Sequence, residues 1–394
     1  MTTTPDDASI PADFSICRGG PVYEIGRRFG LRPGAQGLRR LGLTLGLLAW
    51  VPLAGLALLD GVLHQGATIP FWPSVGTHVR FLLAIPLFFL AEALFDTRVA
   101  DVLRRMLEIG LILPSDRPRL AAAVRQAIKA RNSWLLEAAL AILTGAFIWA
   151  GLRTDLPLDV STWRATAGGD PTWAGWWYRL VSLPLFQFLF WRWCCRLVIW
   201  SHLLWRISRL DLQLIPTHPD AAGGLAVLGV AHVDLAPFGF AGCAVLSSSY
   251  AEQIIYAGVP PAAFAVSFTA AVVGTTLLLT APLLLFLPKL IDAKQRALLE
   301  YGTLAATYTR AFAAKWLPTD PPPEEPLLGT PDLQSLADLG SSFDLIRQMT
   351  VVPIAKSQIL LIAASAALPF APLVLVAFPL DQLIIDSMKK VLNV

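Results

Sequence analysis

Apolar side chains gather into seven runs along the chain, and segments rich in charged or turn-forming residues separate the runs. A bilayer with a hydrocarbon core about 30 Å thick is crossed by about 20 helical residues, because an α-helix rises about 1.5 Å per residue. The runs match or approach that length, the second being the shortest. We therefore predict an all-α, polytopic integral membrane protein with about seven transmembrane helices, over 41–63, 79–95, 134–152, 178–204, 237–258, 262–288 and 357–380.

Composition favours a membrane protein over a soluble one. Charged residues make up 15% of the 394 residues, against roughly 25% in soluble globular proteins. Mean hydropathy is +0.59, and the formal net charge of +3 is too small to indicate a nucleic-acid partner. The first 40 residues are polar, and the apolar run after them lacks a small-residue cleavage site. We expect the first helix to remain in the mature protein.

Lysine and arginine set the expected orientation, because cytoplasmic loops carry an excess of them. With a cytoplasmic N-terminus, the cytoplasmic segments hold 23 of these residues and the outer segments hold 4. The opposite orientation would invert this ratio. An odd number of spans then places the C-terminus outside. The expected organisation is a cytoplasmic N-terminal tail over 1–40, a six-helix region over 41–288 with cytoplasmic loops 96–133 and 205–236, a cytoplasmic helical segment over 289–356, and the last helix with its tail over 357–394.

Four charged residues fall at similar depths inside the predicted spans: Glu92, Glu137, Arg192 and Arg196. A charged side chain at that depth costs a few kcal/mol or more unless it is paired or hydrated. We expect the two arginines, one helical turn apart, to pair with the two glutamates. Such a cluster is either an ion or substrate relay or a structural ion-pair lock, and the arginines could also snorkel to the cytoplasmic surface.

A second polar patch, with Ser248 and Glu252, lies on the fifth predicted helix, nearer the outside. A hydrated path joining this patch to the intramembrane charges would favour a transporter.

The most distinctive loop follows the fourth predicted helix and reads DLQLIPTHPDAAGGL over 211–225. Two prolines and a Gly-Gly pair prevent a continuous helix. Imidazole and carboxylate groups of this kind suit Zn, Mn or Fe, which makes a divalent metal one hypothesis. Alternatively, Asp220 could cap the next helix as part of a structural turn, or the glycines could form an anion-binding nest. The candidate metal ligands are Asp211, His218, Asp220, His232 and Asp234.

This loop, and the segment LLGTPDLQSLADLGSSF over 327–343, resemble a family of uncharacterised bacterial multi-pass inner-membrane proteins. The resemblance is clearest from the fourth predicted helix to the seventh. It implies a bacterial inner (cytoplasmic) membrane as the location. It implies no activity and assigns no catalytic residue.

Three functional hypotheses follow. The first is a transporter or channel-like protein that uses the intramembrane charges. The second is a membrane-embedded, metal-dependent enzyme with its site at Asp211, His218 and Asp220. The third is a membrane sensor or assembly factor whose basic cytoplasmic face, rich in arginine over 98–131, binds anionic lipid or a partner protein. The lipid bilayer is the expected partner in all three, and the sequence specifies neither substrate nor oligomeric state.

Overall fold

The computed structural model of the protein describes residues 14–17, 19, 35–154, 161–166, 168–317 and 331–377. Within these ranges almost all regular structure is helical, and extended segments form only isolated bridges rather than strands. The prediction of an all-α chain is confirmed for this part of the protein.

The first half of the fold runs through a series of long helices and short connecting turns. Its elements are α2 (Ala35–Leu59), α3 (Val75–His78), η1 (Val79–Ala84), α4 (Ile85–Glu108), η2 (Pro114–Asp116), α5 (Arg117–Arg131), α6 (Trp134–Thr154), α7 (Trp173–Trp177), η3 (Tyr178–Ser182) and α8 (Leu183–Ser208).

The second half begins after the 211–225 loop. Its elements are α9 (Ala226–Val233), α10 (Ala236–Ala257), η4 (Pro261–Phe264), α11 (Ala265–Thr280), η5 (Ala281–Phe286), α12 (Leu287–Trp316), α13 (Pro331–Gln348), α14 (Lys356–Ala367), η6 (Leu368–Phe370) and α15 (Ala371–Ala377).

Among the described residues, five helical stretches are long and apolar enough to cross a membrane. A sixth forms if α5 and α6, which meet at a 43° bend, act as one broken span. The protein is thus a helical chain of the multi-pass membrane type. The five continuous stretches are Gln36–Leu59, Val75–Glu108, Ala226–Ala257, Pro261–Trp316 and Lys356–Val374.

The run predicted over 178–204 is helical, as η3 and α8, but it is not among these stretches. Gln187, Arg192 and Arg196 interrupt its apolar side chains. The structure therefore bears out five or six of the about seven predicted spans, and the crossing by α8 stays a prediction.

Glycines let α2 contact η1 and α4 closely. A Cβ atom at Gly42 would lie 2.8 Å from the Cβ of Phe89, and one at Gly46 would lie 2.6 Å from the carbonyl oxygen of Phe81. Real Cβ atoms do not approach that closely, so both positions require glycine at this packing distance. Small residues four apart commonly bring membrane helices together in this way.

Polar side chains from neighbouring elements bind carbonyl oxygens close to prolines in the long helices. A proline has no N–H to donate to the preceding turn, so the carbonyl four residues earlier in an α-helix, or three residues earlier in a 3₁₀ turn, loses its usual partner. In three cases the carbonyl three residues before a proline accepts from another helix. The three bonds are Ser182 Oγ to the Ala49 oxygen before Pro52 (2.7 Å), Ser247 Oγ to the Pro369 oxygen before Pro372 (2.7 Å), and His232 Nδ1 to the Leu279 oxygen before Pro282.

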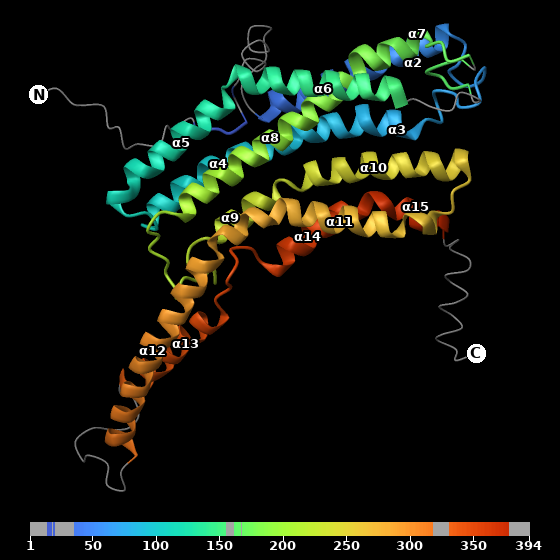
Figure 1. Ribbon diagram of the computed structural model, residues 1–394. Coiled ribbons are helices and arrows are strands. Elements are labelled where there is room, and N and C mark those ends of the chain that lie inside the picture. Colours follow the sequence, from blue (N-terminus) through green and yellow to red (C-terminus); the bar gives the residue numbers. More distant parts are fainter. Residues whose placement is uncertain are drawn as a thin grey trace, which may run out of the picture.

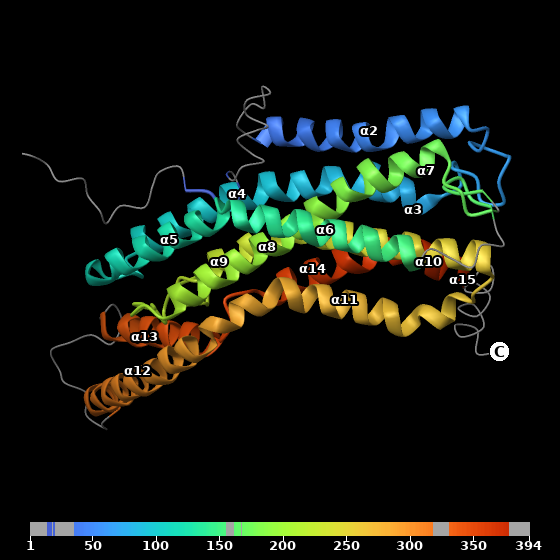
Figure 2. The ribbon, with the colours of Figure 1, turned by 45° about the horizontal axis from the view of Figure 1, so that its top comes forward.

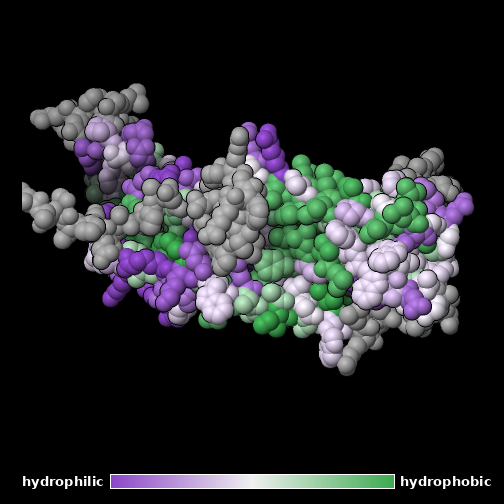
Figure 3. Space-filling view, turned by 90° about the horizontal axis from the view of Figure 1, so that it is seen from above, coloured by the Kyte–Doolittle hydropathy of each residue, from purple (hydrophilic) through white to green (hydrophobic). Residues whose placement is uncertain are grey.

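The helices lie side by side in an elongated bundle, and α12 and α13 form a hairpin that projects from one end (Figures 1 and 2). Figure 3 shows a face on which hydrophobic side chains fill the middle of the molecule, with hydrophilic ones gathered toward the end that carries α5. Large apolar side chains such as Ile142 and Val266 are exposed on the bundle. Water would disfavour this surface, whereas a lipid bilayer accommodates it.

Candidate functional site

A segment near the N-terminus, residues 14–17 and 19, packs into the helical bundle; we call it the tail segment. Residues 14–17 are all buried. The Ser15 hydroxyl donates to the carboxylate of Asp96 on α4, and the N–H of Cys17 donates to the same oxygen at 3.1 Å. The tail segment is therefore held by specific polar contacts.

Arg196 on α8 joins the tail segment to Glu92 on α4. Its Nη1 donates to Glu92 Oε2 at 2.7 Å, and its Nη2 donates to Glu92 Oε1 at 3.0 Å and to the Cys17 carbonyl oxygen at 2.7 Å. The two side chains are only 6% and 4% exposed. A buried ion pair is tolerated when its remaining donors are also satisfied, and here the tail segment supplies that acceptor.

Two more arginines donate to carbonyl oxygens of the tail segment. Arg131, at the end of α5, donates to Ser15 O at 2.6 Å, and Arg192, one turn before Arg196, donates to Gly19 O at 3.3 Å. Three guanidinium groups from two helices thus each hold one backbone oxygen of the tail segment. We call the charged side chains that bond to it, together with Glu92, the partner of Arg196, the tail-binding surface; it consists of Glu92, Asp96, Arg131, Arg192 and Arg196.

The sequence placed four charges near one another, and the structure brings Glu92 and Arg196 into direct contact. Arg192 interacts electrostatically with Glu92 and with Glu137. Sequence reasoning did not identify Asp96, although it follows Glu92 by four residues, the spacing of one helix face. It also missed the tail segment, because polar composition does not indicate the surface against which a segment packs.

The patch predicted around Ser248 and Glu252 serves to join helices. Glu252 Oε1 accepts from the Ser74 hydroxyl at 3.0 Å and from the N–H of Gly76 at 2.9 Å, at the start of α3. Ser248 donates to the carbonyl of Val245 within α10. Glu252 thus links α10 to the first N–H groups of α3, which have no partner inside that helix.

The 211–225 loop is organised around Asp220. Its Oδ1 accepts from the N–H groups of Ala222 (2.9 Å) and Gly224 (3.1 Å), and its Oδ2 accepts from Ala226 (3.0 Å) at the start of α9. The Nδ1 atom of His218 lies 2.8 Å from Oδ1. Partial burial acts to raise the pKa of Asp220, but the three backbone donors and His218 outweigh it, so the pKa lies below its usual value.

The backbone of this loop is strained beside Asp220. Ala221 has a φ of +52°, in a region that residues other than glycine rarely adopt. Its carbonyl accepts both from the N–H of Thr350 at 2.7 Å and from the Thr350 hydroxyl at 3.0 Å. Strain of this kind persists only where the surroundings fix the conformation, and it is common at functional sites.

The five candidate metal ligands do not gather around one point. The N–H of Asp211 donates to Asp116, and the carboxylate of Asp234 pairs with Arg98 at 2.9 Å. His232 uses both ring nitrogens, one toward Leu279 and the other as acceptor from the indole N–H of Trp200 at 3.1 Å. Among the described residues, which include all five, no group of three or more His, Cys, Asp or Glu side chains could hold a metal ion. The residues present thus do not fit the hypothesised Zn, Mn or Fe site.

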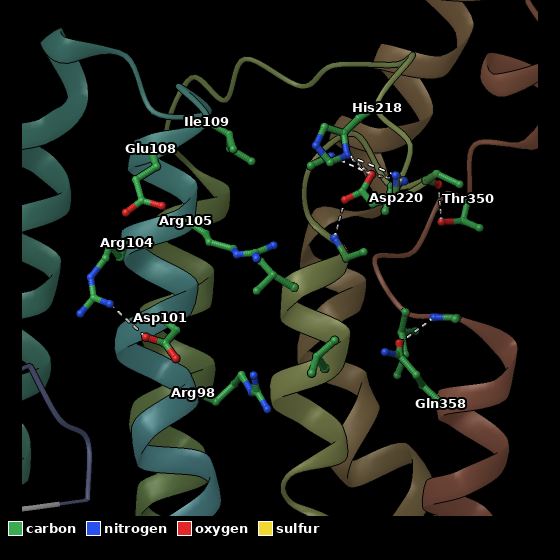
Figure 4. Close-up of a pocket in the computed structure, with 18 residues that line it drawn as sticks. Arg98, Asp101, Arg104, Arg105, Glu108, Ile109, His218, Asp220, Thr350 and Gln358 are labelled. Carbon is green, nitrogen blue, oxygen red and sulfur yellow. Dashed lines mark hydrogen bonds and ion pairs between the residues drawn. The ribbon is translucent and has the colours of Figure 1, made fainter. Parts of the chain in front are cut away.

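A cavity of about 850 Å³ lies beside the Asp220 loop (Figure 4). Three walls enclose it: the second half of α4, the loop with α9, and the segment from Thr350 to Gln358 that leads into α14. Its volume falls in the range of small-molecule sites. The polar side chains that line it are those of Arg98, Asp101, Arg104, Arg105, Glu108, His218, Asp220, Thr350 and Gln358.

Comparisons with protein-family models, with curated proteins and with solved structures found no match for this chain. We therefore infer function from the tail-binding surface and from the cavity.

Proposed function

We propose that the protein crosses a bacterial inner membrane seven times, with its N-terminus in the cytoplasm. Six of the spans are the five continuous stretches and the bent α5–α6 pair, and α8 supplies the seventh. In support, α8 lies among the long helices and runs along the bundle with them (Figure 2). The distribution of lysine and arginine favours this orientation, and the resemblance of the two motifs supports the bacterial location.

We further propose that the protein is a transporter or channel-like protein for small anions, closed in this structure by its own tail segment. The observation that carries this proposal is the set of three bonds from Arg131, Arg192 and Arg196 to carbonyl oxygens of the tail segment. A backbone carbonyl oxygen bears partial negative charge, so it stands where an oxygen or halide of an anion could bind.

The composition of the tail-binding surface supports a conducting role. Glu92 belongs to an apolar part of α4, where an ionisable group is expensive and commonly marks a substrate or ion pathway. Besides the Glu92–Arg196 pair, which joins α4 to α8, all three guanidinium groups donate to carbonyl oxygens of the tail segment. In this proposal, departure of the tail segment makes these donors available to an anion.

The test is anion flux in proteoliposomes that hold a chloride- and nitrate-sensitive dye. We expect the full-length protein to conduct weakly and a variant lacking residues 1–19 to conduct both anions at least tenfold faster. In the truncated protein, Arg192→Gln should lower the flux, whereas Arg206→Gln, on the same helix but away from the tail segment, should not. A truncated protein that stays monodisperse and conducts neither anion would rule out the proposal.

Neither alternative hypothesis gains comparable support from the tail-binding surface. The metal-dependent enzyme lacks three gathered ligands among the described residues. The sensor hypothesis depends on the basic cytoplasmic face, where the cavity lies.

A further inference from the structure

We propose that the cavity beside the Asp220 loop is a binding site for a phosphate group carried by a partly apolar molecule. This inference is independent of the transport proposal, because the cavity and the tail-binding surface share no residue. It assigns a ligand class to residues that the tail does not touch.

Helical spacing sorts the α4 side chains that line the cavity. Arg98, Arg105 and Ile109 follow one another at intervals of seven and four and so share a face of α4. Figure 4 shows Arg98 and Arg105 extending from α4 toward α9, with Arg104 and Glu108 on the other side of the helix. The face of α4 that looks into the cavity therefore carries two arginines and also Asp101, whose carboxylate pairs with Arg104.

The guanidinium N–H groups of Arg105 are available to bind a ligand. Arg104 pairs with Asp101 at 3.1 Å, and Arg98 pairs with Asp234 at 2.9 Å. Among the described residues, the guanidinium group of Arg105 makes no ion pair or hydrogen bond. A free guanidinium at the wall of a cavity is suited to bidentate binding of an oxyanion.

The opposite wall is fixed, and hydrogen bonds already occupy both oxygens of its acid. Both carboxylate oxygens of Asp220 accept backbone N–H groups, and His218 lies against one of them. With Nδ1 directed at Asp220, His218 protonated on both ring nitrogens would donate from Nε2 to a ligand oxygen. The Thr350 hydroxyl donates to the carbonyl of Ala221, whose backbone is strained, and this bond helps to fix the conformation of the wall.

A phosphate suits two facing walls better than a carboxylate does. A carboxylate has two oxygens in one plane, and a single arginine can engage both. The oxygens of a phosphate point in tetrahedral directions, so one pair can bind Arg105 while another oxygen reaches His218 across the cavity.

The rest of the cavity is apolar on one side. Val227, Val230 and Ile354 line it, and Arg98 and Gln358 add polar groups near them. A bare phosphate ion would leave this part unused. The ligand is therefore either a phospholipid headgroup, placed where a cytoplasmic leaflet would present it, or a soluble organic phosphate with an apolar portion.

The test uses the purified full-length protein in neutral detergent at fixed ionic strength, with thermal unfolding as the readout. The probes are glycerol 3-phosphate, short-chain phosphatidylglycerol and, as a zwitterionic control, short-chain phosphatidylcholine. We expect at least one of the two anionic probes to raise the melting temperature in a saturable manner, and phosphatidylcholine to have less effect. A response to glycerol 3-phosphate identifies a soluble organic phosphate as sufficient, and a response to phosphatidylglycerol alone identifies a lipid headgroup.

An arginine outside the cavity provides the matched control. Arg105→Gln should weaken binding of the active probe at least tenfold, while Arg310→Gln, exposed on α12 and outside the cavity lining, should leave it within about twofold of wild type. His218→Gln should weaken binding severalfold. Equal effects of the two arginine substitutions, no effect of His218→Gln, or no response to either anionic probe would overturn the proposal.

Discussion

At the scale of single residues, side-chain donors from other helices bind the carbonyls three residues before Pro52, Pro282 and Pro372. A carbonyl oxygen that loses its N–H partner inside an apolar bundle costs free energy, because no water replaces it. A serine or histidine from another helix supplies a donor in each case. The same bond explains why His232 is not available as a metal ligand.

Substitution of His232 should therefore affect stability more than substitution of Ser247. His232→Phe leaves the Leu279 carbonyl and the Trp200 N–H without partners, and each such group costs about 1–3 kcal/mol. Ser247→Ala leaves one carbonyl unsatisfied and should cost about half as much. Thermal unfolding in detergent measures both. A smaller loss for His232→Phe than for Ser247→Ala would contradict this role for the histidine.

The sequence predicts individual residues best where a charged side chain inside an apolar run would be unfavourable without a partner. Glu92 and Arg196 were identified because charges inside apolar runs require partners, and the structure pairs them. The loop residues His218 and Asp220 were identified by turn chemistry, which leaves open whether an aspartate caps a helix or binds a metal. The tail segment could not be anticipated, because its bonds to Arg131, Arg192 and Arg196 join residues more than a hundred positions apart.

At the scale of elements, the apolar runs predicted where helices form but not always where they end. The helix predicted over 79–95 continues as α4 to Glu108, since an amphipathic pattern follows the apolar run. The helix predicted over 262–288 continues past Pro288 into α12. Hydrophobicity marks the part of a helix suited to lipid, whereas the helix itself extends as long as its backbone and one packed face allow.

The α12–α13 hairpin is joined at both ends by polar contacts. Near the bundle, Lys294 donates to the carbonyls of Arg347 and Met349. Farther out, Asp332 Oδ2 accepts from Lys315 Nζ at 2.8 Å and from the indole N–H of Trp316 at 3.1 Å. The start of α13 is thus attached to the last turn of α12.

Loss of the Asp332 carboxylate should release the start of α13. The bond from Lys315, followed by that from Trp316, holds the pKa of Asp332 below its usual value. The stabilisation from these two bonds is therefore complete at pH values above the ordinary aspartate pKa. It is lost as the pH falls through the lowered pKa of Asp332. At neutral pH, Asp332→Asn should speed amide hydrogen exchange in the first turns of α13 by about two- to fivefold.

Asp338 offers a matched control for that experiment, because it lies on α13 and bonds only Gln334 through its carboxylate among the described residues. Asp338→Asn should leave exchange at the start of α13 unchanged. If both substitutions had the same effect, the contact with Lys315 and Trp316 would not hold the hairpin.

At the scale of the whole molecule, the two ends of the bundle differ in chemistry. One end carries α5, the Asp220 loop and the hairpin, and the other carries the turns that join α2 to α3 and α10 to α11 (Figure 1). The first end is rich in arginine and lysine, as the sequence predicts for a cytoplasmic side. The tail-binding surface and the cavity both include residues of α4. A measurement of which side of the membrane one of them faces therefore also orients the other.

Alkaline phosphatase fusions test this orientation and the crossing by α8 together, because the enzyme is active only outside the cytoplasm. We expect fusions after Gly169 and Gly258 to be active and fusions after Gly110 and Thr217 to be inactive. Gly169 precedes α8 and Thr217 follows it. The helix itself carries the charged residues Arg192 and Arg196. Equal activity at these two positions would show that α8 does not cross. Arg192 and Arg196 would then lie at the membrane surface, where they could not line an anion pathway through the membrane.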